Sequence, residues 1–303
     1  MLNLLNAMSE KVIFQGKELL AKELSNNKLM RRYYPLSDNN NIYWIESNSG
    51  PKGLSSIIRY NILEAKSSNI TEKKYNVGSK IHGYGGIPYF VGSGIVYFID
   101  SEDQDIYQIK NEETKKVFSM QNVSIGEIAA HNNHLYFVIE DFNVNNKINP
   151  SNYIAHIDLD DPSQLKKSVF GASFYSNLKI SNDGKKLLWL QWDLPNMPWE
   201  SSELHTGDIL ESGDINNCNY IDGGNGKSIF QPEWDKNKIV YVREVNDRGE
   251  LFEFDGSCKK QIIDLRIDLM KPLWVSGLVS YKIIDNEYIF ATGWKIGRTK
   301  QVI

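Results

Sequence analysis

The most constraining feature of the sequence is a run of β-branched and aromatic residues that recurs six times along the chain. Its copies are IYWIE (42–46), VYFID (96–100), YFVIE (136–140), LWLQW (188–192), VYVRE (240–244) and YIFAT (288–292). Each copy has the length and composition of a β-strand. Successive copies lie about 50 residues apart, which is the period of a β-propeller blade.

The residues around each copy place it within a hairpin. A short polar turn comes directly before it, such as NN at 132–133 or NDG at 182–184. Asn, Asp and Gly tolerate the positive φ that hairpin turns require, so each copy is the second arm of a hairpin. The first arm precedes the turn, a third run follows the copy, and four units add a short outer strand such as KKVFSM at 115–120. Each unit is therefore predicted to be a four-stranded antiparallel sheet.

Such a sheet cannot bury both of its faces alone, so neighbouring sheets must stack around a ring. The sequence predicts an all-β fold, a β-propeller of four-stranded antiparallel blades with six recognisable units. The sixth unit reaches only its third strand at Ile303 and is expected to be incomplete at the C-terminus. We expect the propeller to span 36–303 and residues 1–35 to form an N-terminal extension. Its KVIFQGKELLAKEL pattern fits a strand followed by a helix that helps to close the ring.

Charge and cysteine content indicate which partners and which cellular compartment to expect. The formal net charge is −4, and Lys and Arg are scattered, so no nucleic-acid partner is expected. Cys218 and Cys258 are too few for a disulfide framework and fit a reducing compartment, although one bridge between them stays open. No signal-peptide pattern and no run long enough to cross a bilayer occurs. We expect a cytoplasmic protein without a membrane partner.

Four longer segments carry a resemblance to a known family. They are KIHGYGGIPYFV (80–91), SNDGKKLLWLQWDLPNMPWESSEL (181–204), SIFQPEW (228–234) and KPLWVSGLVSYKIID (271–285). In this order and spacing they resemble the N-terminal propeller of the acylaminoacyl-peptidase-like and dipeptidyl-peptidase-like branch of the prolyl oligopeptidase superfamily. The resemblance covers residues 40–303 and departs from the family pattern at Gly83 and Leu194.

The resemblance implies a two-part serine peptidase, in which a propeller caps an α/β-hydrolase domain and the active site lies between them. The hydrolase domain requires a G-x-S-x-G nucleophile elbow, followed by an acid and a histidine. The sequence contains no G-x-S-x-G, and its five histidines fall in propeller strands or turns. We therefore expect the α/β-hydrolase domain to be absent from this chain, assign no catalytic residue, and expect the chain to be inactive alone.

The role implied for the chain is to gate and position peptide substrates for a hydrolase domain, carried by the same or a separate chain. Two alternatives remain open. One is a free-standing propeller that binds a protein or peptide. The other is a truncated fragment without function.

The loop WDLPNMPWE at 192–200 is the first candidate site. It is long for a propeller turn, and its two prolines fix φ. Trp and Met are enriched in the cores of interfaces. The residues expected to contact the hydrolase domain or the peptide are Trp192, Asp193, Asn196, Met197 and Trp199. In the alternative, the loop folds over its own blade and buries both indoles locally.

Tyr84, in HGYGG at 82–86, is the second candidate. Its hydroxyl either faces the central cavity and binds a peptide, or is buried and bonded to a neighbouring blade. No cofactor is expected, because GGNGKS at 223–228 lacks the first glycine of a phosphate loop. No metal site is expected either, because HNNH at 131–134 has no evident third ligand.

Overall fold

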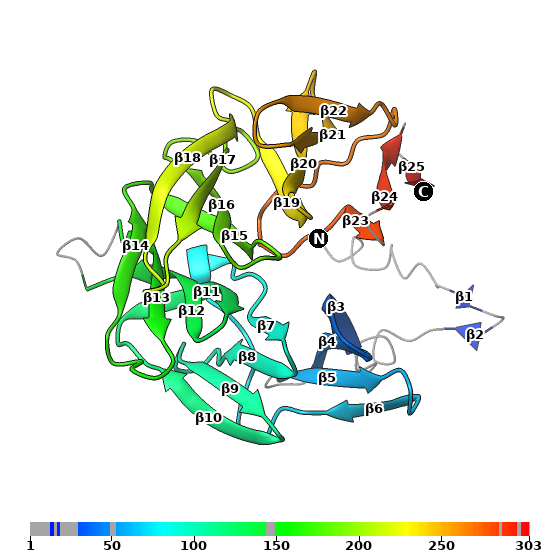
Figure 1. Cartoon of the computed structure of the whole chain (residues 1–303). Coiled ribbons are helices and arrows are strands. Elements are labelled where there is room, and N and C mark those ends of the chain that lie inside the picture. Colours follow the sequence, from blue (N-terminus) through cyan, green and yellow to red (C-terminus); the bar gives the residue numbers. More distant parts are fainter. Residues whose placement is uncertain are drawn as a thin grey trace, which may run out of the picture.

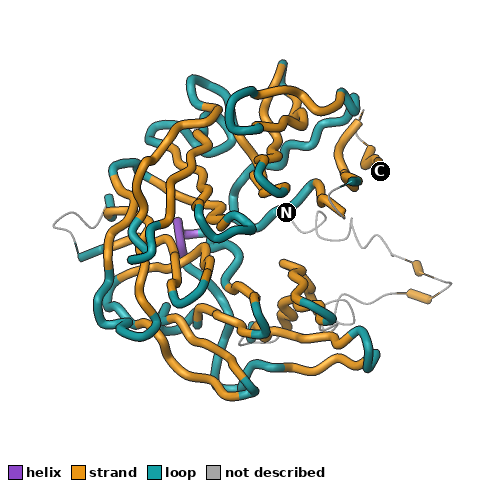
Figure 2. Tube along the Cα trace, in the orientation of Figure 1, coloured by secondary structure: helices purple, strands orange, loops and turns teal. Residues whose placement is uncertain are grey.

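In the described residues, six antiparallel sheets form blades arranged around a central axis (Figure 1), and a separate two-stranded sheet lies near the N-terminus. The computed structural model describes residues 13–14, 17–18, 30–48, 53–143, 149–284, 287–295 and 298–302. Regular structure in these residues consists of strands and one short 3₁₀ turn, η1 (Ile81–Gly83), which packs against the third blade (Figure 2). The predicted all-β propeller with six blades is confirmed.

The strand bounds follow the predicted units. In the first two blades they are β3 (Met30–Asp38), β4 (Asn41–Asn48), β5 (Ser55–Asn61), β6 (Lys66–Asn69), β7 (Tyr89–Gly92), β8 (Ile95–Ile99), β9 (Ile106–Lys110) and β10 (Glu113–Phe118). In the third and fourth they are β11 (Val123–His131), β12 (His134–Asp141), β13 (Ser151–Asp158), β14 (Lys166–Phe170), β15 (Phe174–Ile180), β16 (Lys186–Trp192), β17 (Glu203–Ile209) and β18 (Ile215–Gly223). In the last two they are β19 (Ile229–Asp235), β20 (Lys238–Val245), β21 (Arg248–Phe254), β22 (Lys259–Ile263), β23 (Tyr281–Ile284), β24 (Tyr288–Lys295) and β25 (Arg298–Val302).

Strand order within every blade follows the chain, so each blade is a meander of hairpins. Five sheets have four strands, and the sixth has three in the described residues. The sequence indicates an outer strand in only four units. The outer strand of the first blade, β6, reads KSSN and has no apolar residue that would reveal it.

The core lies between blades, where five apolar clusters join successive sheets. Strand β8 shows why the clusters lie between blades. Adjacent side chains of a strand point to opposite faces of the sheet, so one strand contributes to two clusters. Phe98 packs toward the first blade, whereas Tyr97 and Ile99 pack toward the third. In the described part of the chain, no such cluster joins the sixth blade to the first. The contact there comes from the loop before β23, where Gly277 packs closely against the ring of Tyr34.

A β-bulge recurs in the innermost strand of four blades. The register shifts within β3, β11, β15 and β19, and one residue at each shift has a positive φ, namely Tyr34, Glu127, Asn177 and Gln231. Bulges re-aim side chains and bend the strand. These four residues line a central cavity of about 350 Å³, together with residues from the inner strands of the other two blades.

Only part of the predicted N-terminal extension, residues 1–35, lies within the described residues. Residues 30–35, assigned above to an extension, belong to β3, where the bulge at Tyr34 and Pro35 interrupts the alternation expected of a strand. Residues 17–18 form strand β2 (Lys17–Glu18), paired with β1 (Ile13–Phe14), where the pattern suggests the start of a helix. The rest of the predicted helix lies outside the described residues.

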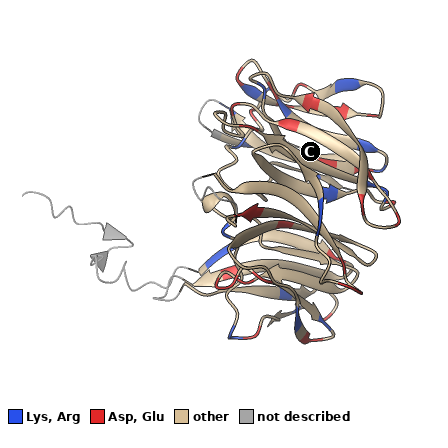
Figure 3. Ribbon diagram, turned by 90° about the vertical axis from the view of Figure 1, so that its left-hand side faces the viewer, with Lys and Arg blue, Asp and Glu red and all other residues tan. Residues whose placement is uncertain are grey.

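Charged residues of both signs are interspersed along the blades (Figure 3). No helix in the described residues is long and apolar enough to cross a membrane.

Candidate functional site

An aromatic cleft of about 110 Å³ lies where three segments distant in sequence meet. Its walls come from η1 and the residues after it, from the fourth blade, and from the loop 264–280 that joins the fifth blade to the sixth. We call it the aromatic cleft and define it by His82, Tyr84, Phe174, Trp192, Met197, Pro198, Trp199, Leu273 and Trp274.

The floor of the aromatic cleft is formed by three rings from three elements, β15, β16 and η1. Phe174 begins β15 and Trp192 ends the neighbouring strand β16, so the two residues pair directly across the sheet and stack at 5.3 Å. His82 meets both edge-on, at 5.1 Å from Phe174 and 5.6 Å from Trp192. Trp192 is only 8% exposed. These contacts give the cleft a rigid base.

The rim is formed by Tyr84, Trp199 and Trp274. The indole of Trp274 packs against Trp199 at 4.4 Å and against Tyr84 at 5.4 Å. Tyr84 is 66% exposed and Trp274 is 49% exposed. Large aromatic side chains exposed together in this way are typical of binding surfaces.

Hydrogen bonds hold the 193–202 loop in place. The Asp193 carboxylate accepts bonds from the backbone N–H and the hydroxyl of Ser173, at 2.6 and 2.9 Å. Glu200 accepts a bond from the Met197 N–H at 2.7 Å, and the Met197 carbonyl accepts bonds from the N–H groups of Glu200 and Ser201. The loop is therefore stabilised by hydrogen bonds within it and by hydrogen bonds to the turn before β15.

The interior of the aromatic cleft is uncharged. Burial lowers the pKa of His82 to about 4, so its imidazole is neutral near pH 7. Its Nε2 is buried, and no hydrogen-bond partner for it lies among the described residues. The backbone N–H of His82 donates to Glu140 at 3.1 Å, and burial raises the pKa of that carboxyl group. An apolar group is therefore the natural occupant of this space.

The structure gathers four of the six predicted site residues around one cleft: Tyr84, Trp192, Met197 and Trp199. Asp193 is exposed and anchors the loop, and Asn196 is exposed outside the cleft. For the aromatic residues, the alternatives were exposure at a binding surface and local burial, and Trp192 and Tyr84 differ in this respect. Trp192 is buried locally against its own blade, whereas Tyr84 is exposed, so the buried alternative for Tyr84 is wrong. Tyr84 also lies in the aromatic cleft and not among the residues that line the central cavity, which it was expected to face if exposed.

Sequence reasoning missed three aromatic members of the cleft: His82, Phe174 and Trp274. His82 and Trp274 lie inside segments that carry the family resemblance, HGYGG and KPLWVSG, and an aromatic residue in such a loop is a usable signal. Phe174 looks like an ordinary strand residue, and only the pairing of β15 with β16 brings it to Trp192.

The central cavity is a second site, and charged side chains lie among its apolar lining residues. Lys179 and Glu233 face each other within it, with 3.4 Å between Nζ and Oε1. The nearby carboxyl group of Glu127 has a raised pKa because it is buried. Gln231 connects the fifth blade to the sixth, since its amide donates to the Tyr281 carbonyl at 2.7 Å and accepts from the Ser280 N–H at 2.6 Å. These contacts hold neighbouring blades together.

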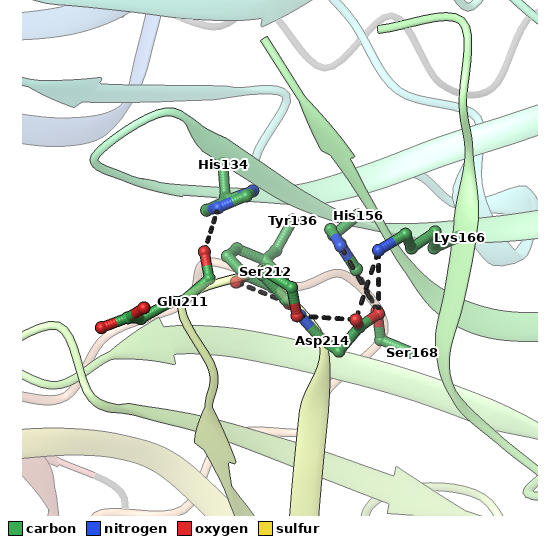
Figure 4. A network of polar contacts seen from close by, with 9 residues as sticks. His134, Tyr136, His156, Lys166, Ser168, Glu211, Ser212 and Asp214 are labelled. Carbon is green, nitrogen blue, oxygen red and sulfur yellow. Dashed lines mark hydrogen bonds and ion pairs between the residues drawn. The ribbon is translucent and has the colours of Figure 1, made fainter. Parts of the chain in front are cut away.

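A serine, a histidine and an aspartate also meet between the third and fourth blades (Figure 4). His156 Nδ1 is 2.6 Å from Ser168 Oγ, but its Nε2 is 3.9 Å from Asp214 Oδ1, which exceeds hydrogen-bond length. Asp214 instead accepts bonds from Ser212 and Lys166. A catalytic triad requires the aspartate to hold the histidine N–H directly. These polar contacts link the third blade to the fourth.

The fold and the site define a six-bladed β-propeller with an aromatic cleft between its blades. Neither a protein-family model nor a curated protein matches the chain in sequence. Solved structures do match. A puromycin hydrolase has a TM-score of 0.78 and 19% identity, over 86% of this chain and 43% of that one.

Two further structures extend the comparison. The acylaminoacyl peptidase of Pyrococcus horikoshii has a TM-score of 0.63 and 12% identity, over 91% of this chain and 44% of that one. The oligogalacturonate lyase of Vibrio parahaemolyticus has a TM-score of 0.58 and 10% identity, over 91% of this chain and 78% of that one. The chain thus spans less than half the length of the hydrolase and the peptidase. The predicted resemblance to the peptidase propellers is confirmed at the level of the fold.

Proposed function

We propose that the chain is the non-catalytic propeller portion of a serine peptidase of the prolyl oligopeptidase type. Its role is to gate and position peptides for an α/β-hydrolase domain on the same or a separate chain. The observation that supports this proposal is the match to puromycin hydrolase, which covers 86% of this chain but only 43% of the hydrolase. The remainder of such a protein has room for a catalytic domain.

The position of the aromatic cleft supports the same role. Its walls come from three separate parts of the ring, so a ligand in it contacts a rigid frame rather than one mobile loop. The exposed rings of Tyr84 and Trp274 lose contact with water when a partner covers them, which favours association. Without a nucleophile elbow in the sequence, the chain contributes binding and access, not bond cleavage.

The proposed location is the cytoplasm. Cys218 and Cys258 are both exposed and unpaired, which fits a reducing compartment.

A free-standing binding propeller is the second candidate. The observation that favours it is the match to oligogalacturonate lyase, of which this chain covers 78%. A propeller of this size therefore also occurs in a protein with little additional chain.

Photo-crosslinking at the aromatic cleft separates the two candidates. A benzophenone amino acid replaces Tyr84 in the protein expressed in its source cells, and cross-linked peptides are identified by mass spectrometry. The proposal predicts cross-links to a segment of a domain that carries G-x-S-x-G. The control position is Tyr288, which is 56% exposed on the sixth blade and should give none of these cross-links. Cross-links only within the propeller, or equal yields at both positions, would contradict the proposal.

A further inference from the structure

We infer that the aromatic cleft binds one apolar side chain of a peptide, and that the adjoining groove holds the main chain of the same peptide. This inference rests on the proposed function, because it names the chemistry by which the propeller positions a substrate. It commits to peptides that carry an aromatic or large aliphatic residue.

The size and chemistry of the aromatic cleft suit one apolar side chain. Its volume of about 110 Å³ is well below the several hundred Å³ typical of a site for a whole small molecule. One side chain is the unit that fits. In the part of the chain that the structure describes, no Lys, Arg, Asp or Glu lines it, and His82 is neutral near pH 7. Transfer of an aromatic or large aliphatic side chain from water into such a space is favourable.

A groove adjoins the aromatic cleft. This groove has a volume of about 250 Å³ and shares Tyr84 and Gly85 with the cleft. Its walls are mostly small or polar, including Gly53, Gly78, Gly86, Ser55, Ser79 and Asn76. Glycine lets a ligand approach the backbone closely, where N–H and C=O groups can pair with a peptide main chain. A polar groove beside an apolar pocket matches an extended peptide that docks one side chain.

The glycines of this junction are required by packing. A Cβ on Gly85 would lie 2.4 Å from the Ser79 carbonyl oxygen, and Gly85 has a φ of 76°. A Cβ on Gly86 would clash with Ser276 Oγ, which lies at that position. Ser276 Oγ accepts a bond from the Ile87 N–H at 3.2 Å. A side chain at Gly85 or Gly86 would therefore clash with Ser79, which lines the groove, or with Ser276, which lines the cleft.

The test is a fluorine NMR titration of the purified chain labelled with 5-fluorotryptophan. The chain has seven tryptophans, and replacing each with Phe assigns its resonance. Gly-Phe-Gly and Gly-Leu-Gly are the probes, and Gly-Gly-Gly is the control peptide. We expect saturable shifts for Trp199 and Trp274 with the first two peptides only. Trp294 is 53% exposed on the sixth blade and should not shift.

Two variants then locate the binding. Trp274→Ala removes one side of the rim, and Tyr84→Ala removes another at a position exposed enough to spare the fold. Each should weaken binding of Gly-Phe-Gly at least fivefold, whereas Trp294→Ala should leave it unchanged. Equal shifts with Gly-Gly-Gly, equal shifts at Trp294, or no shift would overturn the inference.

The outcome is separable from that of the proposed function. The titration needs no hydrolase domain, and the photo-crosslinking needs no peptide. A cleft that binds no peptide but cross-links to a G-x-S-x-G domain would retain the proposed function and assign the cleft to the domain contact instead. Peptide binding without such cross-links would favour the free-standing binding propeller.

Discussion

At the scale of single residues, Trp192 and Trp274 belong to the same cleft but have opposite environments. Trp192 is 8% exposed and stacks on Phe174, whereas Trp274 is 49% exposed. Trp192→Ala should lower the free energy of unfolding by about 3 kcal/mol, because it leaves a cavity in a packed region. Trp274→Ala should change it by less than about 1 kcal/mol. Denaturant unfolding monitored by circular dichroism measures both, and equal losses would contradict the assigned burial.

His82 makes stability depend on pH. Its pKa is lowered by burial to about 4 in the folded state, while that of an unfolded histidine is about 6.5. The unfolded chain therefore binds the extra proton as pH falls through this window, and the folded state loses about 3 kcal/mol by pH 4. His82→Asn removes the titration and suits the positive φ of 52° at this position. Unfolding measured from pH 7 to pH 4 should be less pH-dependent in the variant, and parallel curves would refute the account.

At the scale of elements, the connections between blades depend on particular glycines. Gly223 ends β18 with a φ of 93°, and a Cβ there would lie 2.2 Å from the Ser202 carbonyl oxygen. Gly226, in the same connection, has a φ of 74° and nothing near its Cβ position. Gly226→Ala should cost about 1 kcal/mol through backbone strain alone. Gly223→Ala should cost at least twice as much, because the backbone must also move. Thermal unfolding distinguishes the two variants, and equal costs would show that the close packing is absent.

The elements also show which parts of the fold can be read from sequence. In the second to fifth blades, the second strand is a compact apolar run because its two faces belong to two different clusters, one toward each neighbouring blade. The second strands of all six blades were predicted. The bulges at Tyr34, Glu127, Asn177 and Gln231 were not, because they break the alternation on which strand prediction depends. The same limit applies to the site. Trp192, Met197 and Trp199 stand out in one loop, but only the ring brings Trp274 and Tyr84 to them.

At the scale of the whole molecule, five apolar clusters couple the six blades in succession. Each blade depends on its neighbours for burial, so the ring should lose several blades together when one interface fails. Phe98→Ala, in the cluster between the first two blades, removes a fully buried ring and should lower the melting temperature by several degrees. Hydrogen exchange should show lost protection in both adjacent blades. Loss confined to the first blade or to the second would argue against coupled blades.

We propose that this chain provides binding and access while a separate domain performs the chemistry. The most direct measurement is labelling with a fluorophosphonate, which reacts with an activated serine. The account predicts that the purified chain of 303 residues is not labelled. The same reagent is then applied to the native protein from its source cells, which is recognised by tryptic peptides of this chain. That protein, as one polypeptide or as a complex, should be labelled at a serine within G-x-S-x-G. Labelling of the purified chain, or an unlabelled native species, would contradict the claim.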